Sequence, residues 1–198
     1  MCLMNAVIAI DNDPTRLALA RHNAQIYGVA DHIEFILADF ISFAKSYLAS
    51  HTPPASTDAR KIDVIFLSPP WGGPSYLNES TSPLKGSSDD DEEAKKTDAT
   101  HGYPPYSLAS IKPIHGAELF HLSRKITKNI AYYLPRNTHM EEISELLRDP
   151  QIGNSAELGK RSDKKEEVVE VEEAWTGSKL KAITCYFGGL ASGQEVVF

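Results

Sequence analysis

The sequence has few of the residues that cross-link a protein or bind metal. Among its 198 residues it has two cysteines, Cys2 and Cys185, which form no closely spaced pair, so a disulfide framework is not indicated. The seven histidines show neither HxxxH nor HExxH spacing, so we expect no metal site. No apolar stretch approaches the ~20 residues that a membrane-spanning helix needs. These absences favour a globular chain without a structural metal or a membrane span.

A basic excess, the usual mark of a protein that binds long nucleic acid, is also missing, because the net charge is −7. Most of the acidity lies in two polar segments, residues 78–112 and 150–174, which each hold seven acids and four bases. The remaining 13 acids and 12 bases leave the rest of the chain nearly neutral. Such a body lacks a long basic groove but permits recognition of a small, local piece of a nucleic acid.

The hydrophobic pattern predicts alternating strands and helices. Short continuous apolar runs, typical of buried parallel strands, occupy residues 5–11, 32–39, 61–68 and 129–135. Helical spacing is found over residues 14–27, 41–49, 116–127 and 139–148. The first of these helices has an N-cap acid and a proline at its start, Asp13 and Pro14, and a glycine stop at Gly28. An alternating segment over 166–175 and a run over 179–190, joined by TGSK, predict a terminal antiparallel hairpin.

This order predicts an α/β fold with a mostly parallel sheet, in one domain spanning residues 1–198. Two polar segments interrupt it. Residues 78–112, which include SSDDDEEAKKTD, lack the apolar content needed to order themselves, so we predict a disordered acidic insert there. Residues 150–166 are predicted to be a polar loop.

Ligands of open parallel sheets bind outside the carboxyl ends of the strands, and this chain has polar and aromatic residues there. The predicted strand ends carry Asp11, Asp39 with Phe40, the segment 68–71 (SPPW), and Arg136 with Asn137. Each has a purely structural explanation: an aspartate can cap the next helix, a tryptophan can close the core, and Arg-Asn can form a turn. Their occurrence at one edge favours a binding site, with Asp11 suited to ribose hydroxyls and Asp39 to the amine of adenine.

The segment VIFLSPPWGGP, residues 64–74, is the most specific of these. Proline fixes φ and has no N–H, so SPPW is a stiff exit from the strand that leaves carbonyl groups as acceptors. Oγ of Ser68 and the carbonyl of Pro69 could orient an exocyclic amine and take up positive charge that develops on it. Trp71 could stack on a flat base, which is worth roughly 1–3 kcal/mol, and a cationic base would add about 1–2 kcal/mol.

Four stretches of the chain closely resemble the trimethylguanosine synthases. They are VIAIDNDPTRLALARHNAQIYGVADHIEFILADF, VIFLSPPWGGPSY, KITKNIAYYLPRN and KLKAITCYFG. The resemblance covers residues 5–77, 115–149 and 179–190. It implies a Rossmann-like class I methyltransferase fold and S-adenosyl-L-methionine as the cofactor. It also implies methyl transfer to N2 of the 7-methylguanosine cap of small nuclear and nucleolar RNA, and a location in the nucleus or nucleolus.

The resemblance assigns roles to residues on both sides of the reaction. On the cofactor side, Asp11 matches the ribose-binding acid and Asp39 the adenine-binding acid, with Phe40 beside it. Asn12 stands on the adenine side, where the family usually has an aliphatic residue. Ser68 is assigned both to the cofactor side and to the cap side.

On the cap side, Ser68 and Pro69 match the residues around the target amine, and Trp71 matches the aromatic ring that stacks on the methylated guanine. Asn23 and Arg136 match positions directed at the cap phosphates, and Asn137 stands beside Arg136.

The chain departs from the family at its front. A class I methyltransferase opens with a strand and a Gly-rich turn that holds the methionine end of the cofactor, and no Gly-rich loop precedes Asp11. In the family that strand lies between the two strands that here cover 5–11 and 62–68, and each unpaired buried backbone group costs about 1–3 kcal/mol. We therefore expect an N-terminally truncated chain that is marginally stable or that pairs these two strands directly.

Three functions remain open at this point. The first is a cap guanine-N2 methyltransferase. The second is a methyltransferase acting on another base amine of RNA. The third is a truncated, non-catalytic module that binds the cap or a basic partner. The combination of Trp71 with Arg136 favours a charged cap that carries phosphate over an uncapped base.

Overall fold

The computed structural model describes residues 6–50, 61–71, 105–148 and 167–191. They belong to two compact units, residues 1–61 and residues 62–198. The expectation of one domain spanning residues 1–198 stays a prediction.

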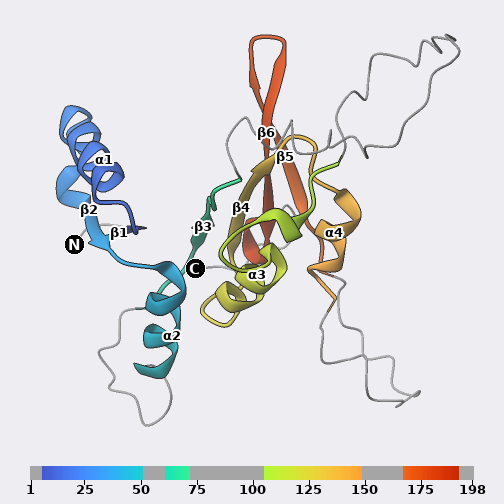
Figure 1. Cartoon of the computed structure of the whole chain (residues 1–198), viewed down its shortest axis with the longest axis horizontal. Coiled ribbons are helices and arrows are strands. Elements are labelled where there is room, and N and C mark those ends of the chain that lie inside the picture. The colour runs from blue at the N-terminus through green and yellow to red at the C-terminus, as the bar shows by residue number, and fades with distance from the viewer. Residues whose placement is uncertain (1–5, 51–60, 72–104, 149–166, 192–198) are drawn as a thin grey trace, which may run out of the picture. The chain divides into compact units, whose positions relative to one another are not determined.

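In its described residues, the first unit forms two strands and two α-helices (Figure 1): β1 (Val7–Asp11), α1 (Pro14–Ile26), β2 (Ile33–Leu37) and α2 (Phe40–Ser50). The two strands pair in parallel, with Asp11 opposite Leu37. A parallel pair needs a crossover, which α1 provides.

Helix α1 begins at the predicted residue and ends at Ile26, one residue before the predicted end. The carboxylate of Asp13 accepts hydrogen bonds from the backbone N–H groups of Thr15, at 2.8 Å, and Arg16, at 3.3 Å. Pro14 occupies the first helical position, where its missing N–H costs nothing. Gly28 follows the helix with φ of 69°, a left-handed conformation that ends helices and favours glycine.

The second unit contains a four-stranded sheet in the order β3-β4-β6-β5. Its strands and helices are β3 (Ile65–Leu67), α3 (Gly116–Arg124), β4 (Ile130–Pro135), α4 (Met140–Glu145), β5 (Glu170–Thr176) and β6 (Lys179–Phe187). Strands β3 and β4 are parallel, and β6 is antiparallel to both β4 and β5. Figure 1 shows the β5–β6 hairpin extending beyond the end of β4.

The core of this unit lies between the sheet and its helices. The ring of Phe120 on α3 lies 4.5 Å from that of Phe187 and stacks on Tyr132 at 6.4 Å, centroid to centroid. Ile143 of α4 is also fully buried. Because side chains alternate along a strand, Tyr132 faces these helices and its neighbour Tyr133 lies on the opposite face of the sheet.

The predicted α/β class is confirmed, with parallel strands and a C-terminal antiparallel hairpin whose β5 is an edge strand. Within the units, β1 pairs with β2 and β3 with β4. The expected direct pairing of residues 5–11 with 62–68 would join the two units and stays a prediction. Marginal stability, the other expectation, stays a prediction.

The predicted acidic insert differs from expectation at its C-terminal end. Residues 105–112 are ordered, and Tyr106, Leu108 and Ile111 are buried. Tyr106 bridges to Thr138 beyond the end of β4, so long-range contacts compensate for a polar local composition. Residues 78–104 of the insert and the polar loop over 150–166 lie outside the described residues.

Candidate functional site

Two predicted cofactor residues meet at the carboxyl edge of the β1–β2 sheet. Asp11 ends β1, and its backbone carbonyl accepts the N–H of Ala38 at 3.1 Å, which ties the ends of the two strands together. Asp39 follows one residue later, directly before α2. The structure therefore brings these two carboxylates to one edge, as the strand pattern predicted.

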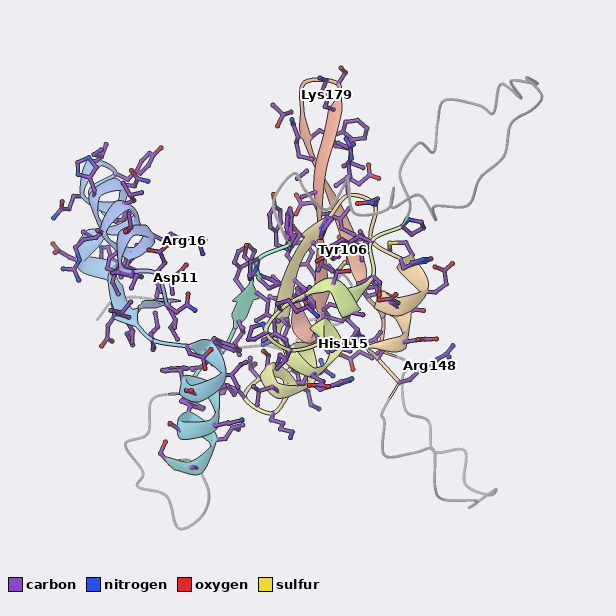
Figure 2. All side chains as sticks on the ribbon, viewed as in Figure 1. Asp11, Arg16, Tyr106, His115, Arg148 and Lys179 are labelled. Atoms are coloured by element: carbon purple, nitrogen blue, oxygen red, sulfur yellow. The ribbon has the colours of Figure 1, made fainter. Side chains whose placement is uncertain are left out.

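The carboxylate of Asp11 has a structural partner on each oxygen. Oδ1 accepts the backbone N–H of Asp13 at 2.8 Å. Oδ2 lies 3.9 Å from Nη1 of Arg16, and Figure 2 labels this pair. The side chain of Asp11 remains 32% exposed. It thus orients the start of α1 and still presents an acceptor at the sheet edge.

The carboxylate of Asp39 caps α2. Its Oδ2 accepts two hydrogen bonds from Ser42, from the backbone N–H and from Oγ, both at 2.8 Å. The backbone N–H of Ser42, followed by its hydroxyl, lowers the pKa of Asp39 below the usual 3.8. The group is therefore an anion at neutral pH, and a capped, fixed anion is a suitable acceptor for the N–H groups of an amine.

The other predicted residues of this unit differ in their positions. Asn12 is exposed beside Asp11, and Phe40 is half-buried as the first residue of α2. Asn23 lies near the far end of α1, where its carbonyl accepts the N–H of Tyr27 at 3.0 Å. At 1.5 Å per residue, Asn23 is about 14 Å along the helix from its start. The structure does not bring Asn23 to the edge where Asp11 lies.

The predicted cap residues of the second unit follow the carboxyl end of β3. Ser68 is exposed and Pro69 is half-buried. Trp71 is also half-buried, and its Nε1 donates a hydrogen bond to the carbonyl of Tyr133 at 3.3 Å. The rings of Trp71 and Tyr133 lie 4.9 Å apart at an angle of 40°. The indole is therefore fixed at the edge of the sheet and is not part of the core.

The turn after β4 carries the remaining predicted residues. Nη1 of Arg136 donates to the carbonyl of Leu180 on β6 at 3.2 Å. The carbonyl of Asn137 accepts the N–H of Tyr106 at 2.7 Å. Since β3 and β4 are adjacent and parallel, this turn and Trp71 lie at the same edge of the sheet. Arg136 is held beside the hairpin by its contact with Leu180.

Sequence reasoning missed the supporting residues around these groups. Ser42 and Arg16 contact the two aspartates, and their spacing of three and five residues after Asp39 and Asp11 was a usable signal. Tyr133 contacts Trp71 from 62 residues away. Only the alternation within IAYYLP, which places one tyrosine on each face, pointed to it.

In the described parts of the chain, no three histidine, cysteine or acidic side chains are grouped so that they could hold a metal ion. No helix there is long and apolar enough to cross a membrane.

Comparisons with known proteins agree with the resemblance. The chain is 31% identical to the trimethylguanosine synthase of Schizosaccharomyces pombe over 139 residues, which cover 70% of this chain and 45% of that protein. It is 24% identical to the trimethylguanosine synthase of Saccharomyces cerevisiae over 142 residues, covering 72% of this chain and 35% of that protein. The chain thus spans less than half the length of these relatives. The model of a family described as RNA cap guanine-N2 methyltransferase matches residues 2–91 and 102–190. This match includes most of the sequence, and the chain belongs to the RNA cap guanine-N2 methyltransferase family.

Proposed function

We propose that this chain transfers a methyl group from S-adenosyl-L-methionine to N2 of the 7-methylguanosine cap of small nuclear and nucleolar RNA. Membership of a methyltransferase family implies a methyl donor. The observation that carries the proposal is the fixed indole of Trp71 at the exposed end of β3, three residues after the exposed Ser68.

Trp71 suits a methylated guanine because that base is flat and carries a positive charge. Stacking on an aromatic ring is worth roughly 1–3 kcal/mol, and the charge adds a cation–π attraction of about 1–2 kcal/mol. An unmethylated guanine would lose the second contribution. Trp71 therefore provides a physical basis for preferring a 7-methylated cap.

Ser68 and Pro69 would act on the amine that is methylated. Oγ of Ser68 and the carbonyl of Pro69 accept its two N–H groups, which directs the nitrogen lone pair away from them. S-Adenosyl-L-methionine, when bound, would supply the methyl group of its sulfonium and would leave as a neutral thioether. As the nitrogen–carbon bond forms, the same two acceptors stabilise the positive charge on nitrogen, and the proton leaves through Ser68 to solvent.

The residues at the β1–β2 edge fit the nucleoside part of this donor. Asp11 keeps about a third of its side chain exposed (32%), and a carboxylate accepts hydrogen bonds from vicinal ribose hydroxyls. Asp39 is held as an anion by Ser42 and would accept the amine of adenine. Phe40 and Asn12 flank these two acids.

Arg136 would contact the cap phosphates, because a guanidinium is a planar donor that matches phosphate oxygens. Asn137 would assist from the same turn. Asn23, which is exposed near the end of α1, would contact the same phosphates. A nuclear location follows from the RNA class and is part of the proposal.

Methyl transfer from tritiated S-adenosyl-L-methionine to short RNAs tests the proposal. The RNAs carry a 7-methylguanosine cap, an unmethylated guanosine cap or no cap. We expect label only on the 7-methylated cap and its loss in Trp71→Ala. Label on uncapped RNA would replace this proposal with that of a base amine methyltransferase. Cap binding without transfer would replace it with that of a non-catalytic binding module.

A further inference from the structure

One residue outside the predicted site contacts Trp71 in two independent ways. The backbone carbonyl of Tyr133 accepts the indole N–H at 3.3 Å. The phenol ring of the same residue lies 4.9 Å from the indole, tilted by 40°. Trp71 follows a strand and two prolines, so the backbone that leads to it is already restricted. The two contacts with Tyr133 restrict the remaining rotation of its side chain.

The position of Tyr133 explains how it reaches the indole. It lies on β4, and its neighbours Tyr132 and Leu134 are fully buried on the face that the helices cover. Tyr133 points to the other face and is only half-buried. On that face Tyr133 meets the residues that follow β3, through the indole of Trp71.

A third ring continues the contact on the same face. Phe66 of β3 pairs with Ala131, and its ring lies 6.2 Å from that of Tyr133 at 33°. Tyr133 is therefore the middle ring of the series Trp71, Tyr133 and Phe66. Phe66 is 62% exposed, which makes it a lateral support and not part of the core.

We propose that Tyr133 is a positioning residue that holds the Trp71 indole in one orientation, with Phe66 supporting Tyr133 from its other side. The inference rests on the proposed role of Trp71 in stacking on the cap. A side chain that is ordered before binding loses less conformational entropy when the ligand binds, and ordering one such side chain costs about 0.5–1.5 kcal/mol. Tyr133 would order the Trp71 side chain before the cap binds, so that binding does not incur this cost.

The test uses the full chain with Trp175→Phe, which leaves Trp71 as the single tryptophan of the two in the sequence. In this background Tyr133→Leu should increase the local motion of Trp71, measured by time-resolved fluorescence anisotropy without ligand. It should also weaken the binding of 7-methylguanosine triphosphate by about three- to tenfold. Tyr133→Phe keeps the ring and the backbone carbonyl, and should restore both measurements.

Tyr186→Leu is the matched control, because Tyr186 is a half-buried ring on β6 of the same sheet that instead donates to Glu172. It should leave the motion of Trp71 unchanged. If Tyr133→Leu does not fold, Phe66→Leu replaces it, since loss of an exposed ring should preserve the fold while partly loosening Trp71. Circular dichroism identifies folded variants.

Two failures are distinguishable. If Trp71→Ala binds 7-methylguanosine triphosphate as tightly as the parent chain, the proposed cap platform is overturned, and with it the binding role of Tyr133. If Trp71→Ala weakens binding but a folded Tyr133→Leu changes neither anisotropy nor affinity, the cap platform stands and the positioning role of Tyr133 is overturned.

Discussion

The two units of the chain differ in how they are stabilised. The second unit buries large side chains completely, among them Tyr132, Phe120 and Phe187. In the first unit the buried residues of the helices are small, Ala24 and Ala44. The proposed cap residues Trp71, Arg136 and Asn137 thus stand on a packed core, whereas Asp11 and Asp39 stand on a two-stranded sheet stabilised by caps and short-range hydrogen bonds. Local capping hydrogen bonds can therefore position site residues in a unit whose helices bury only small side chains.

The largest expected effect is on the core of the second unit. Phe120→Ala removes a ring that contacts Phe187 and Tyr132, and such a truncation should lower the free energy of unfolding by about 3–5 kcal/mol. Leu19→Ala in α1 is the control. Its side chain is 58% exposed, so it should change stability by less than about 0.5 kcal/mol. Chemical denaturation measures both. Similar losses from the two variants would contradict the difference between the units.

Hydrogen exchange should measure the same difference in stability between the two units without a mutation. Strand β6 lies between β4 and β5, so its amides open only with the unit as a whole. Strand β1 has one partner among the described strands. We expect amides of β1 to exchange about a hundredfold faster than those of β6. Equal protection, measured by mass spectrometry of peptides, would mean that the first unit unfolds together with the second.

The local pattern of the sequence predicted elements well where caps and turns act over a few residues. Asp13, Pro14 and Gly28 placed α1 correctly. Strand β3 is shorter than predicted because the carbonyl of Asp63 accepts hydrogen bonds from side chains of Thr127 and Asn129, which replace backbone pairing.

Helix α4 ends earlier than predicted because tight turn hydrogen bonds follow it, as from Arg148 N–H to the carbonyl of Glu145. Distant contacts were beyond the local pattern of the sequence. The order at Tyr106 depends on its bridge to Thr138. The contact of Tyr133 with Trp71 depends on the register of β3 and β4. These features join residues far apart in the chain, and residue spacing alone does not reveal which of them meet.

The two units should also respond to opposite extremes of pH. In the second unit, burial raises the pKa of the Cys185 thiol from 9.0 to about 12. A group whose pKa is higher in the folded state stabilises the fold below its unfolded pKa and loses that contribution as pH rises. We expect the second unit to weaken between pH 9 and about 12. Cys185→Ala should flatten this part of the profile, measured by thermal unfolding. An unchanged alkaline slope would show that the thiol does not control it.

The smallest expected effect concerns Asp39 in the first unit. Its pKa is lowered, first by the backbone N–H of Ser42. A carboxyl with a lowered folded-state pKa stabilises the fold above its unfolded value of 3.8, and the contribution is lost as pH falls through the folded-state pKa. The first unit should therefore weaken below pH 3.8.

Asp39→Ala removes the cap of α2 and should cost about 1 kcal/mol at neutral pH, whereas Asp39→Asn keeps an acceptor and should cost less. Hydrogen exchange in α2 measures both variants, since the loss is local. If Asp39→Asn preserves α2 and still abolishes binding of S-adenosyl-L-methionine, the carboxylate acts on the ligand as well as on the helix. If both variants leave binding unchanged, Asp39 serves the helix alone, and the proposed adenine contact belongs to another group.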